Sequence, residues 1–295
     1  MVRLQIVEKA IRKLRRALKD FPAAPRVEEV HELRLRVRRA ESVVATLDHG
    51  DKLSGLLMRM ADVRKAAGHV RDMDVLESKA LTLSSKKNVD AAVWLIESLG
   101  QARMKNADKL TNLIEHHRSP LRRGLKNCLR LMAGGSASHV RASADEYLQS
   151  FVSTNAHRAA LTLVDEMIHW PEFDSDNLHD FRLCVKELRT LLELNPPFHA
   201  ELVKALGDLK DSIGEWHDWR ELSRIAGDVL KGKSDRMFLT QINQMRDKQF
   251  RDSLALANAL RKRYFSSGAM VREEDEGLGL RLNIPATDAA MRIAG

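Results

Sequence analysis

The stretch VHELRLRVRRA, residues 30–40, holds the pattern from which the fold of this chain can be inferred. An α-helix turns by about 100° per residue, so it places His31, Arg34 and Arg38 within about 60° of one another. Leu33 and Val37 lie on an adjacent apolar stripe that suits packing against another helix. Like charges at this spacing cost a helix only roughly a few tenths of a kcal/mol per pair. The cationic stripe therefore becomes informative only where it recurs.

The stripe recurs in LHDFRLCVKE at 178–187, and the segments that follow the two copies also match. DVRKAAGHVRDMDVL at 62–76 corresponds to DLKDSIGEWHDWREL at 208–222. The matched pairs are His31 with His179, Arg34 with Arg182, Arg38 with Lys186, Arg64 with Lys210, Gly68 with Gly214 and Asp72 with Asp218. The distance from His to Gly differs between the copies by only two residues, which one loop can absorb. We interpret this match as an internal duplication, hence two helical lobes related by a pseudo-twofold axis.

Apolar residues recur with the helical period along nearly the whole chain, and no segment alternates as a strand would. The predicted fold is all-α, with two pseudo-twofold-related helical bundles around a basic central groove. We expect a first lobe at 1–134, a second lobe at 140–265 and an irregular tail at 266–295, with AGGSASH at 133–139 as the linker.

The periodicity also predicts where individual helices begin and end. Helices are expected over residues 4–18, 27–47, 51–67, 89–117, 121–132, 142–169, 177–194, 199–213, 217–230 and 235–265, with one more starting near Met73. Gly68 and Gly214 are expected to interrupt helices, and Asp72 and Asp218 to act as N-caps just after those interruptions. Trp94, Trp170, Trp216 and Trp219 are expected in the core or between lobes.

Composition narrows the class of protein. Hydrophobic residues make up 44% of the chain and charged residues 31%, as in a folded protein with a substantial core. Only two cysteines occur, Cys128 and Cys184, which excludes a disulfide scaffold and favours the reducing cytoplasm. No apolar run has the length of a membrane span, and the charged N-terminus does not look like a secretory signal.

The charge distribution points to an anionic partner. The net charge is +8, and residues 3–39 hold twelve Lys and Arg against five Asp and Glu. Lys9, Arg12 and Arg16 share one face of the first helix. Two cationic stripes facing one another across a pseudo-axis would be unfavourable alone, but a string of phosphates would neutralise them and release counterions.

Several catalytic and binding motifs are missing from the sequence. It contains no G-x-x-x-x-G-K-[ST], G-x-S-x-G or H-E-x-x-H motif. Aromatic residues make up 5% of the chain, which is low for a protein that stacks single-stranded nucleic acid. The sequence therefore offers no candidate catalytic residues, resident metal or cofactor.

The two copies resemble the conserved histidine α-helical domain (CHAD) family, whose repeat reads roughly H-x-L-R-x-x-x-R-R-x-R followed by G-x-x-[RN]-D. The resemblance covers about residues 1–265. The first copy provides His31, Leu33, Arg34, Arg38, Arg39, Gly68, Arg71, Asp72 and Asp74, and the second His179, Arg182, Lys186, Arg189, Gly214, His217 and Asp218. The sequence departs from the pattern at Glu41 and Glu187, and residues 178–220 hold eight acidic against six basic residues.

The resemblance implies a non-enzymatic protein that binds inorganic polyphosphate in a basic groove lined by both repeats, and that associates with polyphosphate granules in the cytoplasm. Family members are often fused to a triphosphate tunnel domain of the CYTH type, whose β-barrel pattern is missing here. The expected polyphosphate-binding residues are Lys9, Arg12, Arg16, His31, Arg34, Arg38, Arg39, Arg64, His179, Arg182, Lys186, Arg189 and Lys210.

Two alternatives remain open at this point. The chain could be a basic helical protein associated with nucleic acid, for which we expect weaker binding than for polyphosphate. It could also be a phosphohydrolase of polyphosphate or triphosphate, in which Asp72 and Asp218 would bind a divalent metal.

Overall fold

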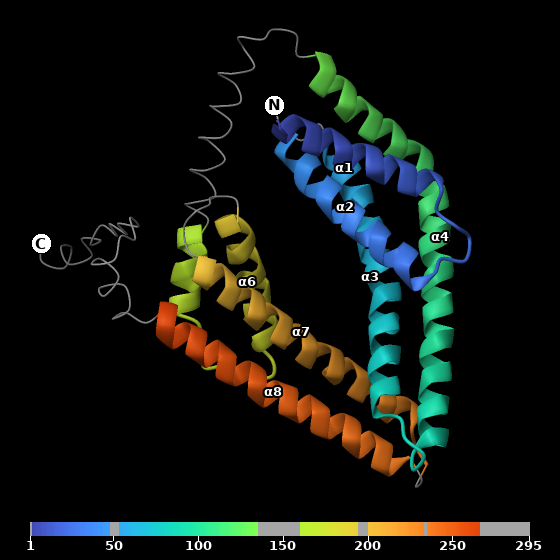
Figure 1. The fold of residues 1–295 in the computed structure, drawn as a ribbon, viewed down its shortest axis with the longest axis vertical. Helices are drawn as coiled ribbons and strands as arrows, with labels where there is room; N and C mark the ends of the chain where they lie inside the picture. The colour runs from blue at the N-terminus through green and yellow to red at the C-terminus, as the bar shows by residue number, and fades with distance from the viewer. Residues whose placement is uncertain (1, 48–52, 135–159, 194–199, 233–234, 266–295) are drawn as a thin grey trace, which may run out of the picture. The chain divides into compact units, whose positions relative to one another are not determined.

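The computed structural model describes residues 2–47, 53–134, 160–193, 200–232 and 235–265, and these are helical with short connections and no strand. Figure 1 labels the main helices of this part of the chain. Their bounds are α1 Val2–Lys19, α2 Val27–Leu47, α3 Ser54–Leu83, α4 Val89–Gly134, α6 Leu178–Glu193, α7 Ala200–Val229 and α8 Arg236–Tyr264. Residues 160–168 are also helical. The predicted all-α fold class is confirmed.

The chain divides into two compact units that are each discontinuous in sequence. Unit 1 comprises Met1–Leu148 and Glu215–Gln249, and unit 2 comprises Gln149–Gly214 and Phe250–Gly295. Each of α7 and α8 therefore contributes one half to each unit. The lobe boundaries at 134 and 140 describe sequence repeats rather than these units, and they stay a prediction, as do the duplication and the central groove.

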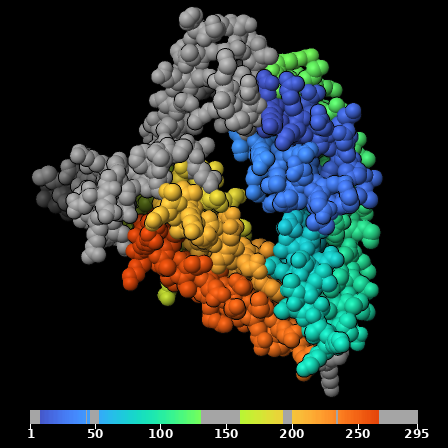
Figure 2. Space-filling view, viewed as in Figure 1, coloured from blue at the N-terminus to red at the C-terminus, as the bar shows by residue number. Residues whose placement is uncertain are grey.

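In unit 1, α1 and α2 pack on one end of the α3–α4 hairpin. The helical spacing of apolar residues puts Ile11, Leu14 and Leu18 of α1 in the core, where none has exposed surface. Val37 of α2 and Leu125 of α4 are buried in the same cluster. Figure 2 shows α1 and α2 side by side over this end of the hairpin.

The other end of the α3–α4 hairpin is buried by the unit 1 halves of α7 and α8. Leu76 of α3 and Leu95 of α4 pack in one cluster with Trp219, Leu222 and Phe238. Lys79 reinforces this contact, since it forms an ion pair with Glu215 and lies over the Trp219 ring at 4.9 Å.

Unit 2 has an aromatic core around α6. The Phe181 ring packs 5.2 Å from Trp170 and 4.7 Å from Phe173, measured between ring centroids. Arg261 of α8 donates to the carbonyl oxygens of Ile168 and Pro171 at 3.3 and 3.2 Å. These bonds hold the connection before α6 against α8.

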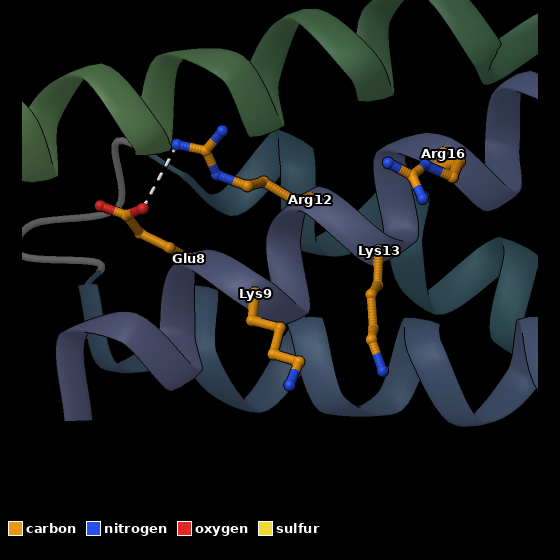
Figure 3. Close-up of a pocket in the computed structure, with 5 residues that line it drawn as sticks. All are labelled: Glu8, Lys9, Arg12, Lys13 and Arg16. Atoms are coloured by element: carbon orange, nitrogen blue, oxygen red, sulfur yellow. Dashed lines mark hydrogen bonds and ion pairs between the residues drawn. The ribbon is translucent and has the colours of Figure 1, made fainter. Parts of the chain in front are cut away.

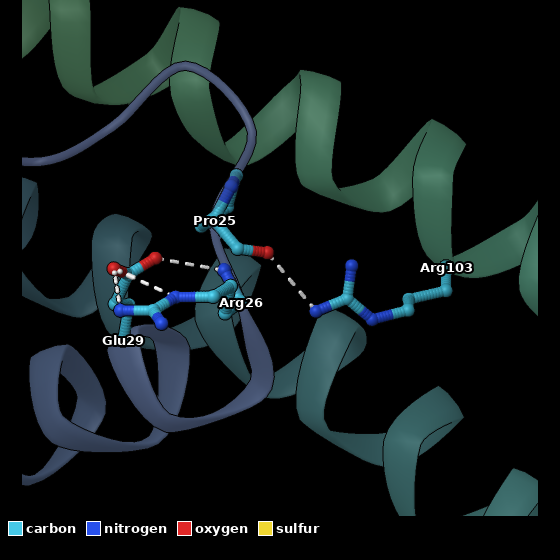
Figure 4. A network of polar contacts seen from close by, with 4 residues as sticks. All are labelled: Pro25, Arg26, Glu29 and Arg103. Carbon is cyan, nitrogen blue, oxygen red and sulfur yellow. Dashed lines mark hydrogen bonds and ion pairs between the residues drawn. The ribbon is translucent and has the colours of Figure 1, made fainter.

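The loop between α1 and α2 is fixed by a polar network (Figure 4). The backbone N–H of Arg26 donates to Glu29 at 2.8 Å, which is one half of a capping box at the start of α2. Arg103 of α4 donates to the carbonyl oxygen of Pro25 at 3.1 Å. Arg103 also pairs with the buried carboxylate of Asp74 at 2.6 Å, so it ties the loop to both α3 and α4.

Several predicted helix bounds agree with the structure. Helix α2 covers the predicted residues 27–47, and α6 lies within one residue of the predicted 177–194 at each end. The end of α7 and the start of α8 also lie within one residue of their predicted positions. The predicted linker beyond residue 134, most of the predicted helix 142–169 and the tail 266–295 lie outside the described residues.

The predicted interruptions at the two matched glycines are wrong. Helix α3 runs through Gly68 and helix α7 runs through Gly214 without a break. Asp72 and Asp218 therefore lie in helix interiors and are not N-caps. The reason is that long-range packing along both helices outweighs the helix penalty of one glycine, which is about 1 kcal/mol.

The predicted division between helices 89–117 and 121–132 is also wrong, because α4 continues through Pro120. Figure 1 shows that α4 bends in its C-terminal third, as an internal proline causes. Trp216 and Trp219 are buried as expected, whereas the Trp94 side chain is 64% exposed. No described helix is long and apolar enough to cross a membrane.

Candidate anion-binding site

The cationic stripe of α2 meets α3 at Gly68. The Arg34 Nε atom lies 3.9 Å from the position that a β-carbon would take on Gly68. This Nε atom is buried and finds no hydrogen-bond acceptor among the described residues. A buried donor without an acceptor costs roughly 1–3 kcal/mol. Arg34 is therefore placed where an external acceptor would satisfy it.

The surroundings of Arg34 are strongly cationic. Its pKa is lowered, first by desolvation on burial and then by the positive charges of Arg38, Arg64 and Arg71. Asp72 opposes this effect but does not reverse it. We call Arg34, Arg38, Arg64 and Arg71 the α2–α3 cluster; its helices bring together residues up to 37 positions apart. The positive charges of Arg38, Arg64 and Arg71 therefore add to burial in disfavouring the charged form of Arg34.

Two carboxylates border the α2–α3 cluster. Glu41 accepts a hydrogen bond from Arg64 at 2.6 Å, and desolvation raises the Glu41 pKa although Arg64 and Arg38 act in the opposite direction. Asp72 keeps solvent-exposed surface, yet desolvation raises its pKa above the ordinary aspartate value. The charges of Arg34 and His217 oppose that rise. His217 belongs to the second sequence copy, so α7 brings it close to the motif of the first copy within unit 1.

Unit 2 repeats the arginine-on-glycine packing. The Arg182 Nη2 atom lies 3.0 Å from the position of a β-carbon on Gly214, and its Nε donates to the carbonyl oxygen of Lys210 at 3.1 Å. The Arg189 guanidinium carbon lies 3.5 Å from the position that a β-carbon would take on Gly207. Arg34 with Gly68 and Arg182 with Gly214 are pairs that the sequence match aligns, so both units use one local arrangement.

The remaining predicted residues of unit 2 differ in exposure. Lys186 is exposed on α6, while His179 is partly buried with a buried Nδ1 atom. The Lys210 amine pairs with Asp211 at 2.7 Å. Arg182, Lys210 and Arg189 thus lie along the α6–α7 contact, and Lys186 lies on its solvent side.

Five predicted residues of unit 1 lie away from the α2–α3 cluster. His31 is exposed on α2. Arg39 lies about 100° around α2 from Arg38. It therefore faces the side of the helix that carries Glu32, on which the Arg39 charge acts. Lys9, Arg12 and Arg16 line a shallow pocket on α1 together with Glu8 and Lys13 (Figure 3). Arg12 forms an ion pair with Glu8 at 3.3 Å.

The α1 residues form a group of their own. Lys13 acts on Glu32 of α2, whereas Arg34 lies against α3 on the other side of α2, about 160° around the helix from Glu32. The structure therefore does not bring Lys9, Arg12 and Arg16 together with Arg34. Their part in binding stays a prediction.

Several arginines that the structure singles out are not among the residues predicted from sequence to bind. Arg71 is predicted only as a motif residue, yet it belongs to the α2–α3 cluster. Arg15, Arg118 and Arg122 each have a buried Nε atom without an acceptor. Arg118 lies one helical turn after buried Ile114, and Arg122 directly follows buried Leu121 on α4. This spacing is a sequence signal for the partial burial of the two arginines.

Among the described residues no group of three or more His, Cys, Asp or Glu side chains is arranged to hold a metal ion. No curated protein shows a significant match to the chain. The family model for the CHAD domain matches residues 5–226, a span that begins in α1, includes both arginine-on-glycine pairs and ends in α7. The matched span covers about three quarters of the sequence and carries both copies of the histidine–arginine motif, and from this match the chain belongs to the CHAD domain family.

Proposed function

We propose that this protein binds inorganic polyphosphate without catalysing a reaction on it. The observation that carries the proposal is Arg34, whose buried Nε lacks an acceptor within a cluster of mutually repelling arginines. A phosphate oxygen would satisfy the Nε donor and offset the repulsion. Membership of the CHAD domain family is consistent with a function related to polyphosphate.

The chemistry of the α2–α3 cluster suits a phosphate chain. Guanidinium groups offer fixed pairs of N–H donors that match two oxygens of one phosphate. Arg38 is exposed and Arg34 half-buried, so the cluster offers both a surface contact and a deeper one. Each bound phosphate replaces a repulsive contact with an attractive one and releases condensed counterions from the polymer.

Unit 2 supplies further cationic contacts of the same type. Lys186 is exposed, and Arg182 is held beside Gly214 by its bond to Lys210. Two binding surfaces on one chain raise the apparent affinity for a polymer that engages both, because the second contact is intramolecular. We therefore propose that long chains bind more tightly than short ones.

The test is calorimetric titration with phosphate chains of graded length, from orthophosphate to chains of about a hundred units. We expect the dissociation constant per phosphate unit to fall by at least about a hundredfold across the series, since every added contact of about 1.4 kcal/mol gives a factor of ten. Equal affinity per phosphate for orthophosphate and long chains would contradict the proposal.

A matched pair of variants locates the site. Arg34→Gln with Arg38→Gln removes two positive charges from the α2–α3 cluster, and we expect about a ten- to hundredfold loss of affinity for long chains. Lys86→Gln with Lys87→Gln removes the same charge from the exposed connection between α3 and α4. Equal losses in both variants would mean that only net charge matters.

The same samples separate the two alternative functions. Under our proposal a long polyphosphate displaces bound DNA or RNA at equal phosphate concentration, whereas a nucleic-acid-binding protein would retain it. Release of orthophosphate after addition of magnesium or manganese would instead support a phosphohydrolase that uses Asp72 and Asp218. Co-localisation of a fluorescent fusion with polyphosphate granules tests the proposed cytoplasmic location.

A further inference from the structure

A second group of unsatisfied arginines lies outside the α2–α3 cluster. The Nε atoms of Arg15, Arg118 and Arg122 are buried, and none has an acceptor among the described residues. No ion pair of these three arginines is found in that part of the chain either. Three buried cationic donors without acceptors in one unit are unusual, because buried polar groups are normally hydrogen-bonded.

The two arginines of α4 lie on the side of that helix that faces α1. Gly124 and His117 mark the side that faces α3: a β-carbon on Gly124 would meet Leu56 at 2.9 Å, and His117 is influenced by the charges of Asp62 and Arg59. Arg118 and Arg122 lie about 100–160° around α4 from those two residues. Since α4 packs on α3 and α1, their burial places them beside α1.

Arg15 lies on the matching side of α1. Lys13 marks the side of α1 that faces α2, because its charge acts on Glu32. Arg15 lies about 160° around the helix from Lys13. Its Nε is buried and α1 packs on α2 and α4, so Arg15 belongs to the contact with α4. We call Arg15, Arg118 and Arg122 the α1–α4 seam.

Acidic residues near the seam do not neutralise it. Glu8 on α1 already pairs with Arg12, whose side chain extends toward α4 in Figure 3. Glu115 on α4 is exposed and makes no ion pair with the seam arginines. None of the three guanidinium groups therefore has a carboxylate partner among the described residues, and each has its Nε atom buried.

We infer that the α1–α4 seam is a second anion site, which takes a phosphate group either as free orthophosphate or as part of a phosphate chain. The guanidinium donors suit a tetrahedral oxyanion, because its oxygens accept bonds from several arginines at once. The inference does not rest on the proposed function, since none of its residues belongs to the α2–α3 cluster.

The seam should lower the melting temperature of the protein when no ligand is bound. Buried donors without acceptors and repelling charges oppose folding, so Arg118→Met with Arg122→Met should melt at the same temperature as the wild type or higher in phosphate-free buffer. The control is Arg123→Met with Arg130→Met, which removes two exposed charges from the same helix.

Ligand is then added to the same samples. Millimolar orthophosphate or tripolyphosphate should raise the melting temperature of the wild type and the control, because a ligand that binds the folded state stabilises it. The rise should fall by at least half in the seam variant. An equal rise in the seam variant and the control would overturn the inference. A rise with tripolyphosphate alone would support it and identify the ligand as a chain rather than a free ion.

Two further measurements cover the remaining outcomes. In wild-type protein, the ¹H–¹⁵N signals of Arg15, Arg118 and Arg122 Nε groups should shift on addition of tripolyphosphate, a test that needs no folded variant. In an Arg34→Gln, Arg38→Gln background the seam signals should still shift, so failure of the polymer site is distinguishable from failure of the seam. Unchanged seam signals in wild-type protein would overturn the inference.

Discussion

Two glycines in helix interiors each face an arginine from the neighbouring helix. Arg34 lies beside Gly68, where its Nε atom is 3.9 Å from the position of a β-carbon, and that is an ordinary van der Waals distance. At Gly214 the packing is closer, because Arg182 Nη2 lies 3.0 Å from the β-carbon position. The Arg182 guanidinium group is therefore positioned in part by the absence of a β-carbon on a different helix.

Alanine substitution separates helix propensity from this packing. Gly100→Ala on α4 should raise the free energy of unfolding by about 1 kcal/mol, since nothing lies within 4 Å of the new β-carbon. Gly214→Ala should gain less and should also weaken polyphosphate binding, because its β-carbon would meet Arg182 at 3.0 Å. Urea denaturation and calorimetric titration check both effects. An equal gain in stability with unchanged affinity would contradict this role of Gly214.

Asp72 partly neutralises the α2–α3 cluster, so its removal should strengthen anion binding. Desolvation raises the Asp72 pKa in the folded protein, which means that the folded state holds the proton more tightly than the unfolded state does. Its contribution to stability is then present below the ordinary aspartate pKa and is lost as pH rises through the raised value.

We therefore expect Asp72→Asn to bind long polyphosphate several-fold more tightly at neutral pH, and to be more stable there than the wild type. The stability difference should shrink as pH falls through the carboxylate range. Asp208→Asn, at an exposed position of unit 2, is the matched control. Melting temperatures and titrations across pH 3–8 check this, and a stability difference that grows at low pH would show the opposite linkage.

The sequence pattern alone proposes Arg34, Arg38 and Arg182, because a cationic residue that recurs beside an apolar stripe has no role in the core itself. It was insufficient for Arg15 and Arg118. Their interest comes from burial between helices that are about a hundred residues apart in sequence, and periodicity along one helix carries no information on that contact.

At the scale of helices, the start of α2 depends on Arg103 of α4. Arg103 donates to Pro25 in the preceding loop and pairs with Asp74, whose side chain is 3% exposed. The pair therefore sets where α2, which carries Arg34 and Arg38, begins relative to α3 and α4. The proposed binding residues of α2 are thus positioned by contacts more than a helix turn away from them.

Breaking that pair should be costly. Arg103→Met leaves the Asp74 carboxylate buried without its cation, and we expect a loss of about 3 kcal/mol in the free energy of unfolding. Arg224→Met removes an arginine that pairs with Glu221 and Asp228 on the surface, and there we expect a loss below about 1 kcal/mol. Urea denaturation of both variants gives the comparison, and equal losses would argue against the anchoring role of Arg103.

The helix pattern predicted most elements but not the continuity of α3, α4 and α7. Gly68, Gly214 and Pro120 weaken a helix locally, so the sequence pattern predicts helix ends at these positions. Residues on both sides of Gly68, such as Val63 and Val70, are fully buried, so tertiary packing holds the helix together across the weak point. Local sequence cannot reveal that balance.

At the scale of the whole molecule, the excess of positive charge predicts a steep dependence of binding on salt. If six or more phosphates are neutralised, the affinity for long chains should fall by about a hundredfold or more between about 50 and 200 mM salt. The Arg34→Gln, Arg38→Gln variant should show a shallower slope, because fewer charges are paired. Titration at several salt concentrations measures both slopes, and identical slopes would place the contacts elsewhere.

The sharing of α7 and α8 between the two units determines how the protein can be divided. A fragment that ends at residue 134 lacks 215–249, so the apolar surfaces of Leu76, Leu95 and Leu99 that pack on Trp219 and Phe238 would be left in water. Such a fragment would aggregate or recruit the missing helices from a second chain. The two halves of this sequence therefore depend on each other for folding. A gene split at the midpoint would yield two products that fold only when they are made together.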